Sequence, residues 1–127
     1  MKKILSILLL CMATFMFFGC SGGSSPKSVA KKALKCQKEN DVKGFANCIY
    51  FKDSDKEYKN LFIQQIENNR KPSQEIESYE FVDEDIDEES GKAKVTFNVT
   101  YKNGRTVKET FKMIRDDSGK WWLNPLY

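Results

Sequence analysis

The spacing of the apolar residues changes near Gln74, and this change constrains the fold more than any other feature of the chain. Before Gln74 the apolar side chains recur at intervals of three and four residues, the period of a helix with one buried face. After it they alternate with polar side chains, the period of a strand with one buried face. Elements segregated in this way predict an α+β domain, in which three N-terminal helices pack on a curved antiparallel sheet of about four strands.

The first two predicted helices begin with clear capping signals. Ser25 precedes Pro26, which the first turn of a helix tolerates, and this pair predicts a helix that ends near Asn40. Asp41 is suited to cap a short second helix that follows directly. Because the two helices are joined by a tight turn, we expect them to form an antiparallel pair.

The third helix is predicted by a capping box, in which Ser54 and Glu57 satisfy reciprocal backbone donors. Pro72 forces this helix to end by about residue 71. Its apolar stripe is strong, and we expect it to face the core. The stripe consists of Tyr58, Leu61, Phe62, Gln65 and Ile66.

Two of the predicted strands have a register that the sequence defines. A two-residue Asn-Gly turn would place lysines on the apolar face, so we expect a three-residue loop over residues 102–104 with Gly104 left-handed. In this register Glu109 lies opposite Phe97, and we expect Glu109 either at a sheet edge or inside a cavity. The pairs on the apolar face are Val99 with Val107, Val95 with Phe111, and Ala93 with Met113.

The N-terminal segment has the organisation of a lipoprotein signal peptide. Lys2 and Lys3 precede an apolar run of 15 residues, shorter than the roughly 20 that a spanning helix needs. Gly19 and Cys20 then supply the small residue and the thiol of a lipidation site. We predict a signal peptide over residues 1–19, a palmitate-bearing Cys20, a flexible tether over residues 20–25 and a single domain over residues 26–127.

Cleavage before Cys20 changes the charge balance. The chain has 21 basic and 18 acidic residues, and the loss of Lys2 and Lys3 leaves 19 basic residues and a net charge of +1. Without a basic excess we expect no nucleic-acid partner. Ser21 directly after the lipidated cysteine favours a location in the cell envelope, with the protein anchored in the outer membrane and facing the periplasm.

Two cysteines remain for the folded domain once Cys11 leaves with the signal peptide and Cys20 carries lipid. The remaining pair, Cys36 and Cys48, predicts a disulfide in an oxidising compartment. The alternative is two buried free thiols. Two thiols in a chain without histidine cannot by themselves fill a four-ligand zinc site.

Residues 75–89 contain nine acidic side chains and no basic one. Alternating carboxylates suit calcium, but Glu88 stands where a calcium loop needs glycine. We therefore expect no metal and no cofactor, and interpret the segment as a solvated strand end that turns at Ser90 and Gly91.

Several segments together resemble a known family. They are the leader that ends in a cysteine, the Ser-Pro that opens the first helix, the Asp-led second helix, and residues 93–97, 101–104 and 119–122, which read Ala-Lys-Val-Thr-Phe, Tyr-Lys-Asn-Gly and Gly-Lys-Trp-Trp. This succession resembles the lumazine-binding-like lipoproteins of domain of unknown function 4878, which are similar to the nuclear-transport-factor-2-like superfamily. The resemblance implies a cystatin-like cone of sheet around a helix, and leaves the function open because one fold hosts many functions.

Three functions remain open from the sequence. The first is a membrane-anchored, non-catalytic domain that binds a small apolar ligand between helices and sheet. The second is a protein–protein interaction module of the cell envelope, and the third is a small enzyme with an acid or tyrosine pocket. No catalytic residue is assigned, because the chain lacks histidine and any nucleophile motif. The candidate pocket residues, for which a filled core is the alternative, are Phe45, Phe62, Tyr79, Phe97, Tyr101, Glu109, Phe111 and Trp122.

Overall fold

The computed structural model describes residues 23–52, 55–71 and 74–125. Its elements are α2 (Pro26–Lys38), α3 (Val42–Ala46), α4 (Lys56–Asn68), β1 (Ile76–Asp87), β2 (Lys92–Tyr101), β3 (Thr106–Arg115) and β4 (Trp121–Leu123). The strands form one antiparallel sheet in the order β1-β2-β3-β4. The predicted α+β arrangement, with helices followed by a four-stranded sheet, is therefore confirmed.

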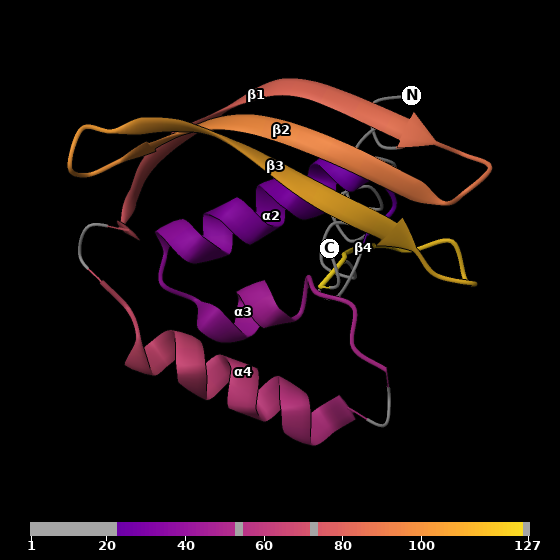
Figure 1. Cartoon of the computed structure of the whole chain (residues 1–127), viewed down its shortest axis with the longest axis horizontal. Helices are drawn as coiled ribbons and strands as arrows, with labels where there is room; N and C mark the ends of the chain where they lie inside the picture. The colour runs from indigo at the N-terminus through magenta and orange to yellow at the C-terminus, as the bar shows by residue number, and fades with distance from the viewer. Residues whose placement is uncertain (1–22, 53–54, 72–73, 126–127) are drawn as a thin grey trace, which may run out of the picture.

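Helix α2 begins as predicted and supplies most of the helical part of the core. Ser25 Oγ accepts a hydrogen bond from the backbone N–H of Ser28 at 3.3 Å, and Pro26 follows in the first turn. After the helix, Asn40 adopts a left-handed φ of 60°, which turns the chain towards α3. Figure 1 shows α2 beneath the concave side of the sheet. Its buried residues include Val29, Ala30, Ala33, Leu34 and Cys36.

The sheet buries its inner face against α2. Val95, Phe97 and Val99 of β2 are each 0% exposed, and Met113 of β3 is 1% exposed. These positions point the same way because side chains alternate along a strand. Burial of a side chain of this size stabilises the folded state by about 1.5–3 kcal/mol, so β2 and α2 form the centre of the core.

The predicted register of β2 and β3 is confirmed. Val99 pairs with Val107, and Glu109 lies opposite Phe97. The loop has the expected form, because Gly104 has a φ of 88° and the backbone N–H of Tyr101 donates to the carbonyl of Arg105 at 2.8 Å. The turn between β1 and β2 also closes where expected, at a left-handed glycine, residue 91.

Strand β4 joins three parts of the chain. Trp121 pairs with Gly23, so part of the predicted tether lies against the sheet. Leu123 donates through its backbone N–H to the carbonyl of Cys48 at 2.7 Å, and accepts from the N–H of Tyr50 at 3.0 Å. These bonds fix the segment that follows α3 to the edge of the sheet.

Helix α4 differs from the prediction. Its N-cap is Asp55, whose side chain makes no capping hydrogen bond, and the predicted cap Ser54 lies outside the described residues. Tyr58 and Leu61 are 62% and 59% exposed, and no residue of α4 is fully buried. The prediction that the whole stripe faces the core is therefore wrong. The reason is that α4 packs on α3, on the side away from the sheet (Figure 1), where only a narrow part of its surface meets a neighbour.

Candidate functional site

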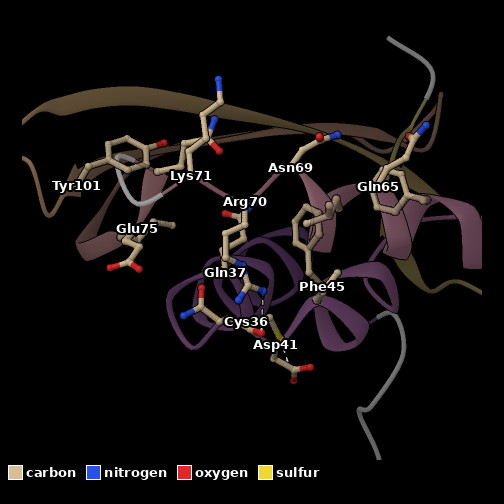
Figure 2. Close-up of a pocket in the computed structure, with 16 residues that line it drawn as sticks. Cys36, Gln37, Asp41, Phe45, Gln65, Asn69, Arg70, Lys71, Glu75 and Tyr101 are labelled. Atoms are coloured by element: carbon tan, nitrogen blue, oxygen red, sulfur yellow. Dashed lines mark hydrogen bonds between the residues drawn. The ribbon is translucent and has the colours of Figure 1, made fainter.

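A cleft lies where the C-terminal ends of α2 and α4 approach the start of β1 and the end of β2. Its volume is about 620 Å³, which falls in the range of about 300–1,000 Å³ that is typical of small-molecule sites. Figure 2 shows Tyr101 and Glu75 at one end of the cleft and Gln65 at the other. With Val42 and Phe45 of α3, the site is thus built by five elements of the chain.

The floor of the cleft is apolar. Val42 of α3 and Ile76 of β1 are 8% and 3% exposed. Phe45 and Phe62 are partly buried against the core, and their rings lie nearly parallel, with centroids 6.5 Å apart and an interplanar angle of 22°. Ile66 continues this surface one turn along α4. A flat apolar group could therefore replace water on the floor.

The rim of the cleft is rich in carboxamides. Five of its lining residues carry a primary amide, and all five are exposed to solvent. Each amide offers two donors and one acceptor oxygen. They come from the end of α2, from α4 and from the segment before β1, and are Gln37, Asn40, Gln65, Asn69 and Gln74.

The charged residues of the wall are of both signs. Asp41 accepts from the backbone N–H of Gly44 at 2.9 Å as the cap of α3, and Glu75 pairs with Lys102 at 3.2 Å. Arg70 donates to the backbone carbonyl of Asn40 at 3.3 Å, which links the ends of α4 and α2. Lys71 completes the wall from an exposed position.

The predicted disulfide between Cys36 and Cys48 is not present, because both residues are free thiols. Each sulfur instead packs beside α3: Cys48 Sγ donates to the carbonyl of Gly44 at 3.5 Å, and a Cβ at Gly44 would lie 2.8 Å from Cys36 Sγ. Burial, followed by the charge of Asp41, raises the pKa of Cys36. Burial also raises the pKa of Cys48 to about 11. The alternative of two buried thiols is the one that this structure contains.

Three of the predicted pocket residues, Phe45, Phe62 and Tyr101, line the cleft. Tyr101 donates through its hydroxyl to Glu109 Oε1 at 3.1 Å, and Glu109 itself does not line the cleft. Burial raises the pKa of Tyr101, and the charge and hydrogen bond of Glu109 raise it further. Tyr101 is therefore a neutral phenol near neutral pH.

The other predicted pocket residues lie elsewhere. Tyr79 and Phe111 pack edge-on against the fully buried Phe97, with ring centroids 6.2 and 6.3 Å from it, and so belong to the core. Trp122 donates through Nε1 to Asp116 at 2.8 Å on the opposite side of β4 from the buried Trp121. The predicted pocket residues therefore lie in three different places: in the cleft, in the core, and beside the turn before β4.

The sequence reasoning missed the carboxamides and Arg70. A usable signal was present in the third helix, where Gln65 interrupts an otherwise apolar stripe. A second signal is that polar residues gather after the ends of two helices, at Asn40 and at Asn69. What the sequence alone does not show is that these two ends meet.

The arrangement of helices followed by a four-stranded antiparallel sheet is also found in a protein of known structure. A crystal structure of a Campylobacter jejuni protein, proposed to be an NTF2-like transpeptidase, is similar with a TM-score of 0.61 and 18% sequence identity. The similarity covers 80% of this chain and 98% of that protein. At this identity it shows the fold alone. No protein-family model matches the chain, and the search of curated proteins gave no match.

The predicted signal peptide, the predicted lipidation site Cys20 and the first part of the predicted tether lie outside the described residues. Within the ranges that the structure does describe, no helix is both long and apolar enough to cross a bilayer. The same ranges hold no group of three or more potential metal ligands from histidine, cysteine, aspartate and glutamate. Membrane attachment of the domain therefore stays a prediction from the sequence.

Proposed function

We propose that this protein is a non-catalytic binding domain, held at the membrane by a lipid on Cys20, that takes up a small ligand with an apolar part in the cleft. The observation that carries this proposal is the cleft of about 620 Å³ with its floor of Phe45, Phe62, Val42 and Ile76. A floor of this kind beside a polar rim is the usual composition of a ligand site. The nuclear-transport-factor-2-like cone supports the proposal, because cones of this fold commonly bind ligands.

The chemistry of the cleft supports binding rather than reaction. An acyl-transfer reaction, such as the name of the Campylobacter jejuni protein suggests, uses an activated nucleophile. The pKa values of both Cys36 and Cys48 are raised, so these thiols are protonated near neutral pH and are weak nucleophiles. The hydroxyl of Tyr101 is engaged with Glu109.

Binding can be tested with the full chain in phospholipid nanodiscs. We expect 5-fluoroindole to show a saturable change in its ¹⁹F NMR signal that empty nanodiscs do not give. Phe62→Ala should weaken this binding at least about fivefold, because it removes part of the floor. Leu61→Ala is the matched control, since Leu61 precedes Phe62 on α4 but is 59% exposed. Equal binding by wild type and Phe62→Ala would rule out the cleft as the site.

Lipid attachment needs a separate experiment. Cells that express the full chain can be grown with an alkyne-labelled palmitate, and we expect the label on wild type but not on Cys20→Ala. The labelled protein should fractionate with the outer membrane. Wild type that remains unlabelled, while a known lipoprotein in the same cells is labelled, would contradict the anchor.

A further inference from the structure

We propose that the ligand carries an uncharged head group with both hydrogen-bond donors and acceptors, such as an amide, attached to its flat apolar part. This inference rests on the proposed function and specifies the ligand class for the same cleft. The five carboxamides of the rim motivate it, because each can donate and accept at once. A rim of this type can satisfy an amide fully, whereas a carboxylate offers only acceptors and an ammonium only donors.

The charges of the wall favour neither an anion nor a cation. Asp41 and Glu75 are balanced in number by Arg70 and Lys71. Glu75 is already paired with Lys102, and Arg70 is held by the carbonyl of Asn40. The C-terminal ends of α2 and α4 border the cleft, and helix C-termini carry partial negative charge that offsets the exposed lysine. An ionic head group would therefore lose hydration, whereas the opposite charges that it could meet, on Asp41, Arg70 and Lys71, are exposed to solvent and therefore screened.

Helix α4 places the apolar and polar contacts in one line. Phe62, Gln65 and Asn69 follow one another at spacings of three and four residues, so they lie on the same side of the helix. Phe62 belongs to the floor, whereas Gln65 and Asn69 are exposed at the rim. A ring that lies on Phe62 and Phe45 would hold its head group within reach of Gln65. This placement explains why a glutamine interrupts the apolar stripe of α4.

Four probes that share one ring can test the head group. They are 5-fluoroindole, 5-fluoroindole-3-acetamide, 5-fluoroindole-3-acetate and 5-fluorotryptamine, which are apolar, neutral polar, anionic and cationic. Binding to the full chain in nanodiscs is measured by ¹⁹F NMR, with empty nanodiscs as the blank for partitioning. We expect the acetamide to bind about fivefold tighter than 5-fluoroindole, the gain expected from one net hydrogen bond, and tighter than either ion.

The matched variants are Gln65→Met and Gln64→Met, since both residues are exposed on α4 but only Gln65 lines the cleft. Gln65→Met should remove the preference for the acetamide over 5-fluoroindole, whereas Gln64→Met should keep this preference. A tighter fit of the acetate or the tryptamine, equal binding of all four probes, or equal behaviour of the two variants would each overturn this inference while leaving a binding cleft. Absence of binding by every probe would overturn the proposed function as well.

Discussion

Asp116 is expected to stabilise the turn that leads into β4, and its substitution by alanine gives the sharpest test of the fold. One carboxylate oxygen accepts from the backbone N–H groups of Ser118 and Lys120, both at 2.9 Å, and from the hydroxyl of Ser118 at 2.7 Å. The other accepts from Trp122 Nε1 at 2.8 Å. Asp116→Ala removes all four side-chain bonds at once and leaves the turn with its backbone bonds, from Gly119 to the carbonyl of residue 116 and from residue 116 to the carbonyl of Lys120.

The pKa of Asp116 gives the magnitude. Burial alone would raise this pKa, but the hydrogen bonds from Ser118, Trp122 and Lys120 outweigh burial and lower it from 3.8 to about 2. A shift of nearly two units corresponds to roughly 2.5 kcal/mol. Because the side chain is only partly buried and solvent screens such interactions, we expect about 1 kcal/mol. In a domain of this size, the loss of about 1 kcal/mol of stability lowers Tm by about 4–8 °C.

The pH dependence follows from the direction of the shift. A depressed pKa contributes stability that is present above the unfolded value of 3.8 and is lost as the pH falls through about 2. Circular dichroism melts of the full chain should therefore show the gap between wild type and Asp116→Ala at pH 7 and little gap near pH 2. Asp117→Ala, at the exposed neighbouring acid, is the control. Equal Tm values for wild type and Asp116→Ala at pH 7, or a gap that does not change between pH 5 and pH 2, would refute the reasoning.

Three further predictions concern stability. The folded-state pKa of Cys48 is raised to about 11, so the stability that its neutral thiol contributes is complete below pH 9 and is lost as the pH rises through 11. In urea titrations, the free energy of unfolding should therefore fall less between pH 8 and pH 11 for Cys48→Ala than for wild type. Glu84 lies on the inner face of the sheet and has a carboxylate oxygen with no hydrogen-bond partner among the described residues. Glu84→Met should therefore stabilise the folded state by about 1 kcal/mol, whereas Glu80→Met, at an exposed position, should not. Leu61→Gln should change the free energy of unfolding by less than about 0.5 kcal/mol, whereas Phe62→Ala should cost about 1–3 kcal/mol, as measured by chemical denaturation.

Features fixed by neighbouring residues could be predicted from the sequence. The caps at Ser25 and Asp41 depend on hydrogen bonds that reach only three residues along the chain. The register of β2 and β3 follows from the parity of alternation, because a one-residue slip would turn every apolar side chain to solvent. That rule also placed Glu109 opposite Phe97, although not its bond to Tyr101.

Features fixed by distant contacts could not be predicted. The stripe of α4 has a helical period, but the period does not say which of its residues meet a partner, and Tyr58 and Leu61 remain exposed. The burial of Cys36 and Cys48 near one another was predicted in part, yet the state of the thiols depends on how α3 lies between them. The cleft depends on the meeting of two helix ends, which the bond from Arg70 to Asn40 fixes.

The position of α4 and the existence of the cleft have the same cause. The hydrogen bonds of Leu123 to Cys48 and Tyr50 hold the segment after α3 at the sheet edge, so α3 occupies the place next to α2. Helix α4 then packs on α3 and on Phe51 of the segment that follows α3, and its apolar residues Phe62 and Ile66 stay only partly covered. An occupant of the cleft would cover this remaining surface, and a ligand that binds only the folded state stabilises it. The apolar surface of α4 that stays uncovered is therefore the surface that a ligand would bind, at the C-terminal end of this helix.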